Sequence, residues 1–501
     1  MKKEILAIPI SLLLFLTSFS GCIEETSQID NQLSIEKPKI VYVDDDYDNT
    51  ISGWGYNYFN SVKDGINKVS EGGTVYVSDG IYYDNIVINK SINLIGNDKN
   101  TTIIDGGKKW DVLKITKDKC TIQNINISNS GSDAGLKILS NRTTLTNNIL
   151  YGNLYGIFIE SRFDNIISNN IFSNNKYDIK LRGTFNTRII KNKILNNIEN
   201  IILESSHNTT VSDNVLQNNG IKISGSFFSW KSHVIENNTA NDKSIYYYKN
   251  ENGVTVPTDA TQVILANCSD FEIKNINFEN IMIGIQIAFS SNIRIENNNF
   301  KSNNESAIQM FTTDNSTIIS NSINGGTGIK LIKSENNRIL QNTLENTDTS
   351  IEIVESNYND ISLNDIFSNS KYGLYLRSSS NFNEISKNNI YDNDVGFRVS
   401  SKHNNIFNNQ FNNNSDKGLY ICCSSQDNTI YKNSFLNNKK HIDYDSSREN
   451  LFIKDGFGNY WDDYLEKYPD ATQINGIWDT PYEIPGSDYE DEYPLVEPVD
   501  I

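Results

Sequence analysis

The chain is poor in proline and cysteine, and both shortages limit what it can be. With 8 prolines in 501 residues and a hydrophobic fraction of 37%, it is a folded chain and not a disordered one. Cys120 and Cys268 are expected to lie too far apart for a disulfide. The neighbours Cys422 and Cys423 are expected to be reduced, because a disulfide between adjacent residues is strained.

Histidine and methionine are also scarce, which bears on metal binding. A copper site needs clustered His, Cys or Met side chains. The chain contains only the scattered histidines His207, His233, His403 and His441. Beyond the first residue its methionines are Met282 and Met310, with no His-x-His or Met-rich tract. Copper binding is therefore not expected from these residues, although an exposed thiol of the cysteine pair could hold a soft metal.

Positive charge is in deficit as well. Lys and Arg total 44 against 62 Asp and Glu, which gives a net charge of −18. Because contacts to phosphate need a basic face, general binding of nucleic acid is excluded.

What the chain has in abundance is a repeat. Asparagine returns about every 22 residues beside an aliphatic residue or Phe, as in Asn147-Asn148-Ile149, Asn169-Asn170-Ile171 and Asn321-Ser322-Ile323. A period this short cannot hold a pair of helices, but it suits short strands separated by turns. Within each unit apolar and polar residues alternate, as in Gly156-Ile-Phe-Ile159, which is typical of a strand with one buried face. The sequence predicts an all-β fold, a single-stranded right-handed parallel β-helix.

Asparagine suits the corners of such coils, because it tolerates left-handed backbone angles and bonds to nearby backbone groups. Equivalent Asn side chains on adjacent coils are expected to form amide ladders, and the aliphatic residues to stack into a dry core.

Three further stretches resemble the NosD-like branch of the right-handed parallel β-helix repeat proteins, which share the pectate-lyase-like fold. The first is Ile40-Val-Tyr-Val-Asp-Asp-Asp46 with Gly72-Gly-Thr-Val-Tyr-Val77, similar to the opening coils of the family. The second runs from Ile245-Tyr-Tyr-Tyr-Lys249 to Val263-Ile-Leu-Ala-Asn-Cys268 and resembles an insertion in this branch. The third, Gly458-Asn-Tyr-Trp-Asp-Asp-Tyr464 with Asp479-Thr-Pro-Tyr-Glu-Ile-Pro485, resembles its closing module. The family name implies a role in maturing a periplasmic copper site.

The domain organisation follows from these patterns. Residues 1–21 are expected to form a signal peptide, with Lys2 and Lys3 before an apolar run that ends at Phe19. Cys22 resembles the lipidated first residue of a lipoprotein, and residues 22–39 would form a polar tether; an ordinary cleaved signal and an uncleaved anchor are the alternatives. Residues 40–110 form the N-terminal cap and first coils, residues 111–450 the repeats with an insertion at 240–265, and residues 451–501 a capping module. The resulting location is outside the cell, on the outer face of the cytoplasmic membrane.

Both ends of a repeat array must be covered. Residues 60–69 are expected to form a short amphipathic helix at the first coil, with Val62, Ile66 and Val69 facing it. An aromatic group is expected to cover the last coil: Tyr460, Trp461, Tyr464, Trp478 and Tyr482. In chains similar to this one an Asp-rich, calcium-like loop precedes the Thr-Pro-Tyr phrase, and Asp470, Asn475 and Asp479 are the oxygen ligands that remain here, so calcium is a weak candidate cofactor.

The sequence does not contain a complete set of residues for catalysis by carboxylates. Hydrolases of this fold need closely placed Asp residues, and lyases need a base with calcium or Arg. Asp44-Asp45-Asp46 is the densest acidic run in the first coils, and Arg398 is the best cationic candidate, but Arg398 has no partner identified from the sequence. The alternative is that these acidic residues are solvent-exposed residues at the corners of the coils and have no catalytic role.

Outward strand positions favour binding instead. If the register of the coils holds, the central residues of successive strands form one stripe, whose cationic and aromatic members are Lys137, Phe158, Lys180, Lys222, Lys330, Tyr375, Arg398 and Tyr420. Aromatic rings stack on sugar rings, and Lys or Arg pairs with uronate or sulfate groups. We therefore hypothesise a groove for an extended anionic glycan, with an ordinary solvent face as the alternative.

The sequence thus favours a monomeric, membrane-anchored surface protein that binds polysaccharide and no nucleic acid. A polysaccharide lyase or epimerase and a NosD-type accessory protein for copper-site maturation are the rival functions.

Overall fold

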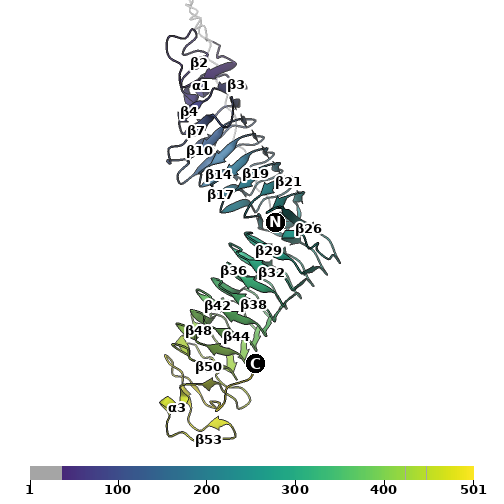
Figure 1. Ribbon diagram of the computed structural model, residues 1–501, viewed down its shortest axis with the longest axis vertical. Coiled ribbons are helices and arrows are strands. Elements are labelled where there is room, and N and C mark those ends of the chain that lie inside the picture. The colour runs from purple at the N-terminus through teal and green to yellow at the C-terminus, as the bar shows by residue number, and fades with distance from the viewer. Residues whose placement is uncertain (1–35, 378, 424, 447) are drawn as a thin grey trace, which may run out of the picture. The chain divides into compact units, whose positions relative to one another are not determined.

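The computed structural model describes residues 36–501 except 378, 424 and 447 (Figure 1). The predicted signal peptide, Cys22 and most of the tether lie outside the described residues. Residues Pro38–Ile501 form one unit.

This unit is a right-handed parallel β-helix of about 18 turns, so the predicted fold class is confirmed. In the N-terminal coils each turn contributes one strand to each of three sheets. These sheets run from β2 (Tyr58–Phe59) through β1 (Ile40–Val43) to β24 (Val234–Glu236), from β4 (Gly80–Tyr83) to β25 (Thr239–Ala240), and from β5 (Ile86–Ile88) to β23 (Ile221–Ser224). The second of them continues through β26 (Lys243–Lys249) into the C-terminal coils.

The C-terminal coils repeat this arrangement. Their sheets run from β27 (Ala260–Ala266) to β51 (Ile442–Asp445), from β28 (Glu272–Lys274) to β49 (Thr429–Tyr431), and from β29 (Asn277–Glu279) to β52 (Tyr460–Trp461).

Two of the sheets contain the long strands, and we call them the N-terminal and C-terminal long-strand sheets. After β5 the N-terminal one contains β8 (Leu113–Ile115), β11 (Ala134–Ile138), β14 (Tyr155–Glu160), β17 (Tyr177–Arg182), β20 (Glu199–Glu204) and β23. Between β27 and β51 the C-terminal one contains β30 (Ile283–Ala288), β33 (Ser306–Phe311), β36 (Thr327–Ile332), β39 (Thr349–Val354), β42 (Tyr372–Leu376), β45 (Val395–Val399) and β48 (Lys417–Cys422).

The alternation seen in the sequence sets the core. In β14 Ile157 and Ile159 are fully buried, whereas Phe158 between them is only half-buried. At the corner before β13 (Ile149–Tyr151), Asn147 adopts a left-handed φ of 55°. The adjacent Asn148 is buried and donates from Nδ2 to Asn170 Oδ1 in the following coil at 3.1 Å. Corner asparagines and amide ladders therefore occur as predicted.

The stripe of outward residues is not continuous, which corrects the prediction. At the end of the N-terminal coils β25 pairs antiparallel with β26 (Lys243–Lys249), and β26 then pairs in parallel with β27. The N-terminal long-strand sheet ends at β23, and its open edge is bonded by side chains from the C-terminal one. Gln262 accepts from Ile221 N at 2.9 Å, and Gln286 accepts from Ile223 N at 3.1 Å. The outward residues consequently form two stripes on two sheets.

Short helices and aromatic rings close the coils. Helix α1 (Val62–Lys68) begins after the cap residue Ser61 and buries Val62 and Ile66, as expected for the N-terminal cap. Helix α2 (Phe227–Lys231) follows β23, and α3 (Tyr464–Lys467) lies in the C-terminal module. There Trp461 stacks between Phe435 at 4.5 Å and Tyr482 at 4.2 Å.

The C-terminal module also contains two hairpins, formed by β53 (Gln473–Ile474) with β54 (Ile477–Trp478) and by β55 (Tyr482–Glu483) with β56 (Glu490–Asp491). In the part of the chain that the structure describes, every helix is too short or too polar to cross a membrane.

Candidate functional sites

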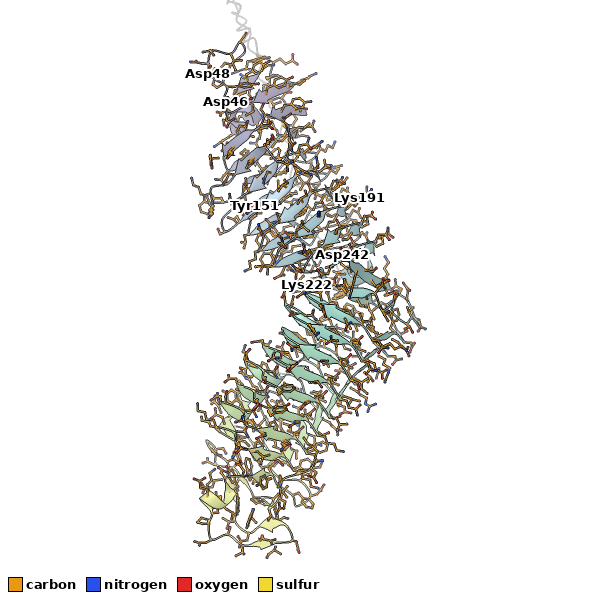
Figure 2. The ribbon with its side chains drawn as sticks, in the orientation of Figure 1. Asp46, Asp48, Tyr151, Lys191, Lys222 and Asp242 are labelled. Carbon is orange, nitrogen blue, oxygen red and sulfur yellow. The ribbon has the colours of Figure 1, made fainter. Side chains whose placement is uncertain are left out.

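The N-terminal stripe is in register but electrically neutralised. Lys137, Phe158 and Lys180 occupy equivalent positions on neighbouring strands. Each of its lysines lies near a carboxylate: Lys137 with Asp111 at 3.8 Å, Lys180 with Glu204 at 3.4 Å and Lys222 with Glu305 at 2.6 Å. Lys222, labelled in Figure 2, thereby links β23 to the residue before β33. This stripe offers little unpaired positive charge to a ligand.

The C-terminal stripe begins in the same way. Lys330 pairs with Glu352 of the next strand at 2.7 Å, and Arg377 bonds the same carboxylate at 2.8 Å. Gln286 is completely buried, since it bonds the edge of β23. The positive charge of Lys330 is therefore compensated within the protein.

Arg398 differs from the other cations of the two stripes. It lies in β45, between Tyr375 of β42 and Tyr420 of β48, in exact register with both. Its guanidinium carbon is 4.8 Å from the Tyr375 ring centre and 5.5 Å from that of Tyr420. Its Nη1 donates to the hydroxyl of Tyr372 at 2.7 Å. We call these four residues the arginine–tyrosine cluster.

No carboxylate forms an ion pair with Arg398 among the residues that the structure describes. Its remaining hydrogen bonds run from Nε to Cys422 Sγ at 3.4 Å and from Nη2 to Cys423 Sγ at 3.9 Å. Burial raises the pKa of the Cys422 thiol to about 11, so that thiol is neutral at pH 7. The cluster therefore combines an uncompensated positive charge with aromatic faces.

The residues proposed as calcium ligands are not gathered. The carboxylate of Asp479 accepts the N–H of Thr472 at 3.0 Å and its hydroxyl at 2.6 Å, and the hydroxyl bond is the main reason that its pKa is lowered. Within the described part of the module no hydrogen bond joins Asp479 to Asp470 or Asn475, and all three residues are exposed or nearly so. Calcium binding there stays a prediction.

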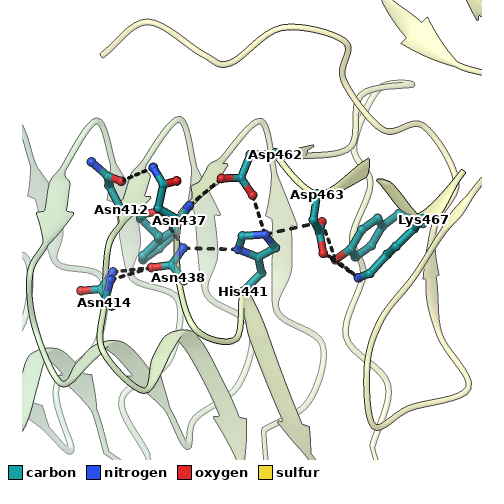
Figure 3. A network of polar contacts seen from close by, with 10 residues as sticks. Asn412, Asn414, Asn437, Asn438, His441, Asp462, Asp463 and Lys467 are labelled. Carbon is teal, nitrogen blue, oxygen red and sulfur yellow. Dashed lines mark hydrogen bonds and ion pairs between the residues drawn. The ribbon is translucent and has the colours of Figure 1, made fainter. Parts of the chain in front are cut away.

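A different cluster lies between the last coil and the C-terminal module (Figure 3). His441 directly precedes β51, and Asp462 and Asp463 directly follow β52. Because Phe435 of β50 (Ser434–Leu436) pairs with Trp461 of β52, the two segments come together. His441 Nε2 is 2.8 Å from Asp462 Oδ1 and 3.5 Å from Asp463 Oδ1. We call these three residues the histidine–aspartate cluster.

Groups other than His441 also hold both carboxylates in place. The backbone N–H of Asn437 donates to Asp462 Oδ2 at 2.6 Å. Asp463 Oδ2 pairs with Lys467 at 2.9 Å, and the Tyr482 hydroxyl donates to Asp463 Oδ1 at 3.1 Å. Burial would raise the pKa of Asp463, but hydrogen bonds from His441 and Lys467 outweigh it and lower that pKa to about 2.

Sequence reasoning missed this cluster because His441 looks isolated in the chain. The available signal was the Asp462–Asp463 pair in the closing phrase together with a histidine one coil earlier. Without the pairing of β50 with β52, nothing in the sequence places them together.

Family comparisons agree with the architecture. Residues 112–260 and 261–407 match the model described as "Right handed beta helix region", which covers more than half of the chain. The chain belongs to this family of right-handed β-helix proteins. Residues 363–466 match the model described as "Periplasmic copper-binding protein (NosD)", as the resemblance implied, and this stretch contains both clusters. No curated protein matched the sequence.

Several solved structures are similar. The A-module of the mannuronan C-5 epimerase AlgE6 from Azotobacter vinelandii is 12% identical, with 78% of this chain and 92% of that chain covered and a TM-score of 0.30. A mutant of the periplasmic alginate epimerase AlgG is 13% identical over 76% and 83% of the two chains, with a TM-score of 0.34. The pectin methylesterase PemA from Erwinia chrysanthemi is 12% identical over 48% and 79%, with a TM-score of 0.25.

Proposed function

We propose that this protein is a secreted β-helix surface protein that binds an extended anionic polysaccharide at the arginine–tyrosine cluster. The observation that carries the proposal is the uncompensated guanidinium of Arg398 between the rings of Tyr375 and Tyr420. Cys22 anchors the protein to the membrane in this proposal, and the periplasmic description of the NosD model supports a location outside the cytoplasm.

The chemistry of the cluster suits uronate sugars. A guanidinium offers a planar pair of donors that matches a carboxylate, and aromatic faces take up the apolar face of a sugar ring. Strands of one sheet are about 4.8 Å apart, so Tyr375, Arg398 and Tyr420, on three successive strands, span about 10 Å along the coil axis. A chain of sugars lying along the sheet would contact all three.

The test compares binding of purified mature protein to a panel of uronate polymers by calorimetry. We expect Arg398→Gln to weaken binding about tenfold or more, since a hydrogen bond to a charged group contributes about 1.5–3 kcal/mol. The triple change Tyr375→Ala, Arg398→Gln and Tyr420→Ala should abolish binding.

A matched control is Tyr391→Ala. Tyr391 also stacks on a ring of the neighbouring coil, that of Phe367 at 4.9 Å, but it belongs to a different sheet. Binding that survives the triple change, or that is lost equally in the control, would refute the assignment. Release of unsaturated products, followed by absorbance in the same mixtures, would instead establish a lyase.

A further inference from the structure

The histidine–aspartate cluster has the composition and spacing of a metal site. The three ligand atoms, one from each residue, all lie within 4.8 Å of one another. Zinc binds nitrogen and carboxylate oxygen at about 2.0–2.2 Å, so tetrahedral ligands are about 3.4 Å apart. The distances from His441 Nε2 to the two carboxylates, 2.8 and 3.5 Å, require only a small opening.

The ligands are held in place before any ion arrives. His441 is 7% exposed and lies beside the rings of Phe435 and Trp461, each 6.2 Å away. The backbone N–H of Asn437 holds the carboxylate of Asp462, and Lys467 and Tyr482 hold that of Asp463. Supporting contacts of this kind orient metal ligands and reduce the cost of ordering them.

An ion could reach the cluster and complete its coordination with water. A cavity of about 520 Å³ opens beside it and is lined by His441, Asp462, Asp463 and Tyr482 among others. The cavity is also lined by Lys439, Lys440 and Asp443, of which Lys440 pairs with Asp443 at 3.0 Å. Of the two ligand carboxylates, that of Asp463 pairs with Lys467 at 2.9 Å, whereas that of Asp462 has no lysine partner among the described residues and is open to a cation.

The donor set also selects the kind of ion. One imidazole and two carboxylates suit zinc or manganese, whereas Cu(I) prefers thiolate and thioether ligands. The cluster contains neither Cys nor Met. The family model matched by this stretch is described as copper-binding. Copper in the Cu(I) state does not fit these three residues, because none of them offers a sulfur ligand.

We propose that His441 Nε2, Asp462 Oδ1 and Asp463 Oδ1 bind one divalent cation of the zinc or manganese class. The ion joins the last coil to the C-terminal module, because its ligands come from both. This site is separate from the arginine–tyrosine cluster, so the two proposals stand or fall independently.

The test uses the full mature chain, stripped with EDTA and titrated with ZnCl₂ by calorimetry. We expect one equivalent to bind, and saturating zinc to raise the Tm of the wild type, because a ligand that binds only the folded state stabilises it. His441→Ala and Asp462→Asn should each weaken this binding at least tenfold and remove the rise in Tm.

Asp462→Asn keeps the size of the side chain and an oxygen that can accept the backbone N–H of Asn437, so this variant is expected to fold. Circular dichroism would reveal any loss of folding. His403→Ala is the control, because His403 is near a single carboxylate, Asp427 at 3.7 Å, and should leave zinc binding unchanged.

Absence of stoichiometric zinc binding in the wild type would overturn the proposal. Equal binding by the wild type and Asp462→Asn would do the same, because it would place the ion elsewhere on the acidic surface. Cu(II) is expected to bind at least as tightly as zinc, as it does at most nitrogen and oxygen sites. Titration with buffered Cu(I) therefore decides the class of ion. Tight binding of Cu(I) that needs His441 would contradict the assignment of the site to the zinc or manganese class.

Discussion

At the scale of single residues, the buried asparagines contribute hydrogen bonds that no apolar side chain could replace. Asn388 donates from Nδ2 to Ile361 O at 2.8 Å and to Asn409 Oδ1 at 2.9 Å. Its Oδ1 accepts from the backbone N–H of Asn364 at 3.1 Å. Each buried asparagine of the ladder therefore bonds buried backbone groups of the neighbouring coils, which explains why so polar a side chain occupies a buried position.

Asn388→Ala should be strongly destabilising for this reason. It removes the acceptor of the buried Asn364 N–H and one donor to the Ile361 carbonyl, and an unsatisfied buried group costs about 1–3 kcal/mol. We expect a loss of about 2–4 kcal/mol in the free energy of unfolding, measured by chemical denaturation with circular dichroism.

The matched control for that substitution is its neighbour. The side chain of Asn389 points outward, and its one hydrogen bond among the described residues is to the side chain of Asp365 at 2.9 Å, so Asn389→Ala should cost less than about 1 kcal/mol. Equal losses in the two variants would show that the ladder adds nothing specific.

At the scale of elements, one ladder position carries a histidine. His233 precedes β24 and accepts the N–H of Thr209 at Nδ1, 3.2 Å away, in the place where Asn165 accepts from Thr143 at 2.9 Å. Its Nε2 is buried without a hydrogen-bonding partner in the described structure. Burial lowers the pKa of His233 from 6.5 to about 3. The folded coil thus keeps this imidazole neutral at pH values where an unfolded chain would protonate it.

This difference makes stability depend on pH. The stabilisation is complete above pH 6.5 and is lost as the pH falls from 6.5 towards 3, by about 1.4 kcal/mol per pH unit. Between pH 7.5 and 5.5 the wild type should lose about 1.4 kcal/mol from this group, as measured by urea denaturation.

His233→Asn restores the usual ladder residue and should remove this loss. His403→Asn, which changes a histidine that is largely exposed, should not. A wild-type pH dependence retained in full by His233→Asn would mean that the buried imidazole is protonated in the fold.

At the scale of the whole molecule, stacked aromatic rings close the C-terminal end. Phe411, Phe435, Trp461 and Tyr482 succeed one another with ring centres 5.0, 4.5 and 4.2 Å apart. Trp461 and Tyr482 are fully buried. The module thus covers the last apolar coil, which an uncapped repeat array would expose to water.

Ending the chain after Leu451 should therefore cause association. The truncation removes Trp461 and Tyr482 and opens the edge of β50, and exposed strand edges pair with other chains. We expect higher-order species in size-exclusion chromatography with light scattering. Removal of Asp500 and Ile501 alone is the control, and monodisperse behaviour of the longer truncation would show that the module is not a cap.

Much of the fold could be predicted because its causes are local. The period of the asparagines and the alternation around residues such as Phe158 depend only on neighbouring positions in the chain. The helix at residues 60–69 and the aromatic cap followed from similar patterns. The alternation also placed Phe158 and Arg398 on the outer side of their strands, where both are half-buried, but it did not reveal the partners of the lysines on the same sheets.

The sequence by itself determined the coil, its corners, its core and the residues that face outward, because each coil repeats one local pattern. The tertiary structure alone decided that the stripe is divided, since Gln262 and Gln286 bond residues of an edge strand that lie 41 and 63 residues earlier in the chain. It also decided which lysines are neutralised, as Lys222 is by Glu305, 83 residues further on, and it left Arg398 uncompensated. The histidine–aspartate cluster exists only because β50 pairs with β52. Charge pairing and ligand geometry are set by distances in space, and these depend on contacts that no local pattern contains.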